Sequence, residues 1–130
     1  MGPYKNAAEL LANSTITIPL YGQRVICVGN PDDLTTVLNH FGIDPSGCTI
    51  GSHGYSISLD NPQQGFVVIV AVFSKHTDII IHEAFHACMF IHENLGLTVD
   101  HDNQETMAYM IGYLARAMLD QLLTTSLGTF

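Results

Sequence analysis

Hydrophobic and polar residues alternate along much of the first half of the chain, whereas the second half follows a helical period. Alternating β-branched residues predict strands, and apolar positions three or four residues apart predict amphipathic helices. The predicted strands cover residues 14–21, 23–28, 48–60 and 66–73. The predicted helices cover residues 29–42, about 78–94 and about 103–123.

The order of these elements predicts the fold class. Strands and one short helix come first and two long helices follow, which is typical of an α+β fold with its helices on one face of a small, mostly antiparallel sheet. Residues 66–73, FVVIVAVF, contain no polar side chain, which predicts a strand buried on both faces. The 130 residues, 47% of them hydrophobic, suffice for one core, so we expect a single domain over residues 1–130.

Charge and cysteine usage narrow the classes of partner. The formal net charge is −8 and only four residues are basic, scattered along the chain, so we expect neither nucleic-acid binding nor attachment to an anionic membrane. The apolar runs are too short to span a bilayer, and the first residues predict no signal peptide. Three cysteines without a C-x-x-C pair favour a reducing compartment, so the expected location is the cytoplasm.

Candidate chemistry is concentrated in HEAFH, residues 82–86. On a helix, His82 and His86 leave the same face about 6 Å apart along the axis, a spacing that lets two imidazoles bind one zinc ion. Glu83 can reach a water on that ion without being a ligand and can act as its general base. Burying two imidazoles and a carboxylate without partners in an apolar stretch would be costly, which favours the metal interpretation over chance.

A third protein ligand is needed for a catalytic zinc site, and His92 is one candidate. The spacing HEAFHACMFIH resembles the metzincin motif, but Met89 stands where that family has a glycine. Without a helix breaker, His92 lies about 9 Å beyond His86 along the axis and well round the helix, so it cannot share the ion. We therefore expect His92 at the surface or the rim of the site.

The other pattern resembles the gluzincins, the thermolysin-like zincins, in which a glutamate on the next helix is the third ligand. That resemblance implies that Glu105, nineteen residues after His86, completes the zinc site. A structural alternative is a capping box formed by Asp102 and Glu105 at the start of the last helix. The resemblance covers residues 66–113 and departs from the family at Tyr109, where an aspartate is expected.

The same residues are similar to small HExxH proteins encoded by bacteriophages and prophages. The resemblance implies a zinc-dependent peptidase or amidase acting on a peptide or protein substrate, with the extended substrate added at the edge of the sheet. The alternative is a catalytically inactive, metal-stabilised module that binds a protein partner. Several side chains are candidates to stabilise a developing oxyanion, with His101 the first choice: His53, Tyr55, His101, Tyr109 and Tyr113.

Overall fold

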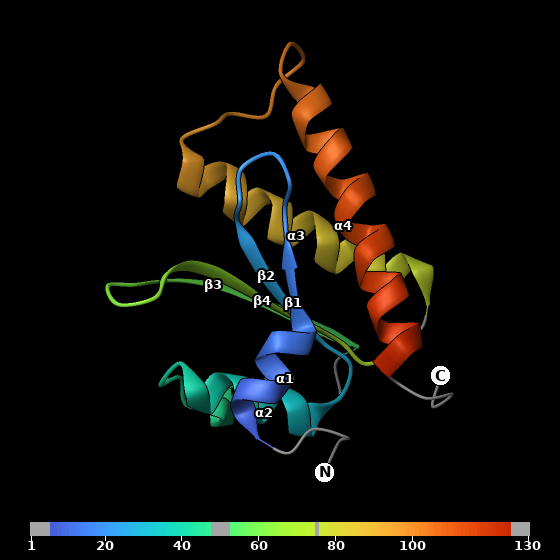
Figure 1. Ribbon diagram of the computed structural model, residues 1–130. Helices are drawn as coiled ribbons and strands as arrows, with labels where there is room; N and C mark the ends of the chain where they lie inside the picture. Colours follow the sequence, from blue (N-terminus) through green and yellow to red (C-terminus); the bar gives the residue numbers. More distant parts are fainter. Residues whose placement is uncertain (1–5, 48–52, 75, 126–130) are drawn as a thin grey trace.

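A computed structural model describes residues 6–47, 53–74 and 76–125, and shows a four-stranded sheet between two layers of helices (Figure 1). Two short helices cover one face of the sheet and two long helices cover the other. The α+β class is therefore confirmed. The expectation that the helices share one face is wrong, because α1 and α2 cover the second face.

The sheet has the order β1-β2-β4-β3. Its strands are β1 (Thr15–Thr17), β2 (Arg24–Val28), β3 (Gly54–Asn61) and β4 (Gly65–Val72). The outer pairs β1–β2 and β3–β4 are antiparallel, whereas the central pair β2–β4 is parallel, so the sheet is mixed. Among the strands of the described residues, this order leaves β3 at one edge of the sheet and β1 at the other.

The helices are α1 (Ala7–Ser14), α2 (Pro31–His40), α3 (Thr77–Leu95) and α4 (Gln104–Thr125), with a 3-10 turn at Pro45–Gly47. Helix α1 was not predicted from the sequence. Its N-terminus is capped by the Asn6 side chain, which accepts the Glu9 N–H, and only Leu10 and Ser14 are buried. An eight-residue helix with so few buried positions has almost no periodic signal.

Strand alternation divides the core into two layers. Val68, Val70 and Val72 of β4 face α3 and α4, whereas Val67, Ile69 and Ala71 face α1 and α2. All six side chains are 0% exposed, which confirms the predicted burial of this strand on both faces. The centre of the sheet is therefore a rigid base on which α3 is packed.

Helix α3 ends where the sequence predicts. Gly96 adopts φ 74°, in the left-handed region that glycine enters without a steric penalty, and its N–H donates to the Glu93 carbonyl. The chain then leaves α3 and rises to the start of α4 (Figure 1). Residues 97–103 thus separate the C-terminal end of α3 from the first turn of α4.

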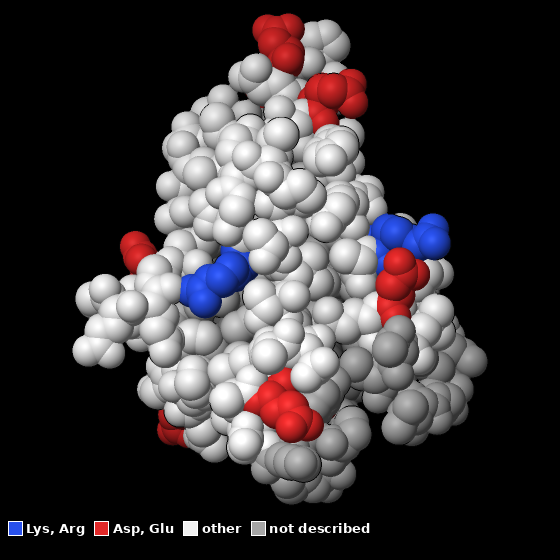
Figure 2. Space-filling view, in the orientation of Figure 1, with Lys and Arg blue, Asp and Glu red and all other residues white. Residues whose placement is uncertain are grey.

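Charged side chains are sparse on the surface. On the face shown in Figure 2, charged groups are few and scattered, and one basic group lies directly against an acidic one at the right of the view. One ion pair joins Arg116 and Asp120 on α4, with 3.1 Å between Nε and Oδ1. Within the described residues, no helix is long and apolar enough to cross a membrane.

Candidate metal and hydrolase site on helix α3

The HEAFH residues occupy the middle of α3 and point their two imidazoles into solvent. His82 and His86 are both exposed, and their Nε2 atoms are 3.2 Å apart. The rings meet edge to face, with centroids 4.7 Å apart and an interplanar angle of 76°. The predicted convergence of the two side chains on one face of the helix is confirmed.

This separation fits two ligands of one zinc ion. Two nitrogens at 2.0–2.1 Å from a tetrahedral ion are about 3.3–3.4 Å apart, close to the 3.2 Å between the two Nε2 atoms. The same distance also suits a hydrogen bond between the rings if one of them carries its proton on Nε2. The pair is therefore compatible with a metal ion, and the geometry alone permits either use.

Glu83 lies about 100° round the helix from His82, toward the sheet. Its side chain is 6% exposed and packs against Gly54 at the start of β3. A Cβ at position 54 would lie 2.6 Å from Glu83 Oε2 and 2.8 Å from its Cγ. Gly54 therefore makes the room in which the Glu83 carboxylate sits between the helix and the edge strand.

The sequence suggests a bulge or bend around Gly54 but does not reveal its neighbour. Glycine inside a strand often marks a close approach of another part of the chain, and that signal was present in SHGYS. Gly54 pairs with Val72 across an unbroken antiparallel register, so the strand contains no bulge from Gly54 to Asn61. Residues 48–52 of the predicted strand lie outside the described residues.

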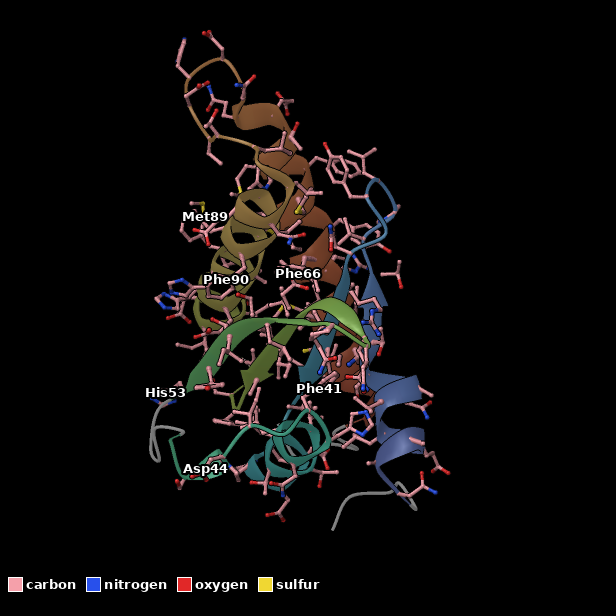
Figure 3. All side chains as sticks on the ribbon, turned by 90° about the vertical axis from the view of Figure 1, so that its left-hand side faces the viewer. Phe41, Asp44, His53, Phe66, Met89 and Phe90 are labelled. Atoms are coloured by element: carbon pink, nitrogen blue, oxygen red, sulfur yellow. The ribbon has the colours of Figure 1, made fainter. Side chains whose placement is uncertain are left out.

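Two of the candidates for stabilising an oxyanion, His53 and Tyr55, lie directly before and after Gly54 in the sequence. Because Gly54 faces α3, the side chain of the next residue, Tyr55, projects to the other side of β3. Tyr55 packs against the core layer that contains α2. His53 is exposed and lies immediately before β3, below Phe90 and Met89 of α3 in Figure 3. Ser56, two residues after Gly54, is the next position on the α3 side.

The structure does not bring Glu105 to the histidine pair. Helix α3 continues for nine residues after His86, about 13 Å. Glu105 is exposed in the first turn of α4, beyond the connection that follows α3. No group of three or more histidine, cysteine, aspartate or glutamate side chains in the described parts of the chain is arranged to hold a metal ion.

The connection between α3 and α4 also holds His101. It is exposed, and its carbonyl accepts a hydrogen bond from Gln104 Nε2 at 3.0 Å. Asp100 stabilises this turn, because its Oδ1 accepts hydrogen bonds from the backbone N–H groups of Asp102 and Asn103. Tyr109 and Tyr113 lie on α4 and are 53% and 37% exposed, and the oxyanion role stays a prediction for every candidate.

The expectation that His92 lies at the surface is wrong. Its side chain is 1% exposed, and Nδ1 is 2.9 Å from the carbonyl oxygen of Cys88. Helical phase explains the burial, since His92 lies about 120° round the helix from His86 and faces the start of α4. Sequence reasoning could place His92 off the metal-binding face, but not under another helix.

The two described cysteines, Cys27 and Cys88, are both free and buried, as expected for core residues. Burial raises the pKa of each thiol to about 12, because the thiolate would lose its hydration. Neither is therefore a ready nucleophile or thiolate ligand near neutral pH. Cys48 lies outside the described residues.

Comparisons with known proteins give no match, whether with protein-family models, curated proteins or solved structures.

Proposed function

We propose that the protein is a zinc-dependent hydrolase of peptide or amide bonds, in which His82 and His86 hold the ion. The observation that carries this proposal is the convergence of their exposed Nε2 atoms to 3.2 Å, with Glu83 next in the chain. Zinc, when bound, lowers the pKa of a coordinated water to about 7 and polarises a carbonyl group.

Glu83 is the proposed general base. Its carboxylate would take a proton from the attacking water and then deliver it to the leaving amine, which needs a fixed position within hydrogen-bond reach of both. Contact with Gly54 restricts where that carboxylate can lie. A restricted carboxylate loses less conformational entropy when it transfers the proton than a free surface glutamate does.

Strand β3 is the proposed support for the substrate. It is an edge strand of the sheet formed by the described residues, and its first residue touches Glu83. An extended peptide added to this edge would form backbone hydrogen bonds and pass beside the α3 histidines. This arrangement favours a peptide or protein substrate.

Glu105 remains the proposed third ligand, carried by the resemblance to the gluzincins. In the arrangement described above, the first turn of α4 would have to approach His86 for Glu105 to bind the same ion. The connection at residues 97–103 is exposed throughout, so a change there would disturb few buried contacts.

The second candidate function is a metal-stabilised binding module without catalytic activity. In this function the exposed pair His82 and His86 would supply two ligands of the ion without supporting catalysis. A hydrolase needs an ion held firmly enough to act and an open coordination position for water. A binding module needs neither, because the ion or the apolar face of α3 has only to contribute to the binding of a protein partner.

Metal analysis of the purified protein tests the proposal first. We expect about one equivalent of zinc after dialysis, loss of zinc from a His82→Ala and His86→Ala double variant, and unchanged binding in His40→Ala. His40 is an exposed histidine on α2 and serves as the control. Absence of zinc from wild-type protein dialysed against micromolar metal would refute the proposed function.

Cleavage of a broad peptide library then separates the two candidates. The hydrolase hypothesis expects cleavage by zinc-loaded wild type and none by Glu83→Gln. Cleavage products that persist in the variant would point to a contaminating peptidase. Zinc-loaded wild type that cleaves nothing would favour the binding module.

A further inference from the structure

The outer face of α3 beside the histidine pair is apolar and exposed. Ile81, Phe85 and Met89 follow one another at intervals of four residues, so their side chains form a stripe along one side of the helix. They are 47%, 45% and 39% exposed, respectively. The ring centroids of Phe85 and His86 are 6.2 Å apart, and Met89 lies on the side of α3 away from the sheet in Figure 3. An exposed apolar stripe of this kind is typical of a surface that meets another protein.

The same face carries little charge near the histidine pair. From Ile79 to His92 the sequence contains one charged residue, Glu83. Its side chain is 6% exposed and packs against β3, so it does not face a molecule that approaches from solvent. Two chains of net charge −8 repel each other at long range, but on this face they can meet without like charges in contact. A divalent cation between them then supplies an attraction.

The donor set of the pair indicates what the partner is. His82 and His86 offer two nitrogens 3.2 Å apart, which is half of a tetrahedral zinc coordination shell. Both imidazoles are exposed, so the other two positions of an ion held by them face solvent. A two-fold axis through the ion brings the same two histidines of a second copy to those positions, as in any isologous contact. A second copy of this chain therefore matches the ion in both number and type of ligand.

We propose that two copies of this chain form a zinc-bridged dimer, in which His82 and His86 of each copy bind one shared ion. The apolar stripe of residues 81, 85 and 89 is then enclosed between the two α3 helices. Stable interfaces contain about 20–30 residues on each side. Three apolar side chains from each copy are too few to hold the dimer together alone, so its formation depends on the zinc ion.

This inference rests on zinc binding by the histidine pair, as the proposed function does, but not on catalysis. An ion with four histidine ligands has no position for a water molecule. The dimer is thus a resting form of the proposed hydrolase, and the monomer is the form that can act on a substrate. A large excess of zinc favours the monomer, because each histidine pair can then hold its own ion.

Sedimentation equilibrium of the full-length protein, with zinc alone as the probe, tests the dimer. Metal-free protein should have the mass of one chain, 14.2 kDa. We expect this mass to double when one zinc ion is added for every two chains, and to return to that of one chain in a large excess of zinc. His86→Ala should abolish the zinc-dependent dimer, because each copy then supplies a single ligand.

Phe85→Ser tests whether the apolar stripe is enclosed in the dimer. It keeps all four histidine ligands and removes one apolar ring from each copy, so the dimer should dissociate at least about tenfold more readily. The matched control is Tyr109→Ser, which removes an aromatic ring that is 53% exposed on α4. It should dimerise like the wild type. Equal dissociation constants for the two variants would overturn the proposed interface.

The remaining outcomes separate this inference from the proposed function. Zinc-loaded protein that stays monomeric at every zinc concentration overturns the dimer and leaves the apolar stripe to a peptide substrate of the hydrolase. A dimer that persists in chelator also overturns it, because the ion would not form the contact. A zinc-dependent dimer whose protein cleaves no peptide at any zinc concentration supports the inference and refutes the hydrolase. If the protein binds no zinc, both proposals fail.

Discussion

Helix α3 places identical side chains in two opposite environments. In its first half, His82 and His86 are exposed and their Nε2 atoms meet in solvent. In its second half, His92 is buried, with Nδ1 held by the backbone of its own helix. Residue type and helical content are the same, so the difference comes from helical phase and from what covers each face.

The covering elements explain the contrast. Beside the first half lies edge strand β3, whose Gly54 accommodates Glu83 and leaves the histidine face open. Over the second half lies the start of α4, with Met107 and Met110 in the same core layer as Ile91. An open pair of imidazoles is accessible to an ion from solvent, whereas the single enclosed imidazole is held by a hydrogen bond within its own helix.

The largest expected effect is on the open half of α3. Glu83→Gln keeps the size of the side chain and removes the proposed base, so peptide cleavage should fall by about 10²–10⁴-fold with zinc retained. The control is Glu93→Gln, an exposed glutamate on the same helix. Equal activity in both variants would remove Glu83 from the mechanism.

Substitutions in the two halves of α3 should have different effects on zinc affinity. We expect His82→Ala or His86→Ala to weaken zinc binding by at least about a hundredfold. Loss of a residue that only hydrogen-bonds to a metal ligand already weakens metal binding about 10–100-fold. His92→Leu should bind zinc like the wild type. Isothermal titration with zinc provides the measurement. If the variants at positions 86 and 92 lost zinc affinity equally, the proposed difference between the two halves of α3 would be wrong.

The same titration sharpens the role of Glu105. Glu105→Gln should weaken zinc binding if the first turn of α4 supplies the third ligand, and Glu93→Gln again serves as the control. Unchanged affinity in Glu105→Gln would restrict the protein ligands to α3. That outcome would also strengthen the binding-module candidate, because two histidines alone hold an ion loosely.

A smaller effect is expected at the contact between β3 and α3. Gly54→Ala introduces a Cβ that overlaps the Glu83 carboxylate, and overpacking of this kind costs about 1–3 kcal/mol of unfolding free energy. Gly112→Ala is the matched control, because nothing lies within 4 Å of its added Cβ in α4. Helix propensity predicts that this control gains up to about 1 kcal/mol. Urea unfolding of both variants provides the measurement.

The smallest expected effect is a difference in stability between two variants of the enclosed half. His92→Ala should lower the unfolding free energy by about 1–3 kcal/mol through lost packing. His92→Leu fills the space and removes Nε2, which is buried without a hydrogen-bond partner among the described residues. Its loss of unfolding free energy should therefore be smaller. Thermal denaturation measures both variants, and a leucine variant less stable than the alanine variant would show that the space does not accept a leucine side chain and would contradict this expectation.

Most local structure was predictable because it depends on neighbours in the sequence. The continuous apolar run of residues 66–73, Pro31 at the start of α2 and Gly96 after α3 each act within a few residues. Helix α1 was missed because its few buried positions give little periodicity. Helices lie on both faces of the sheet because β2 and β4 pair in parallel and the chain between them crosses one face. No local sequence pattern encodes that pairing.

By itself, the sequence determined that His82 and His86 share a face of one helix, because 3.6 residues per turn leave no other arrangement four positions apart. Only the tertiary structure decided that Glu83 is enclosed by Gly54, that Glu105 lies beyond the end of α3, and that His92 is buried under α4. Each of these depends on packing between elements that are distant in the chain. Such packing is set by the shape and volume of whole faces rather than by the spacing of residues.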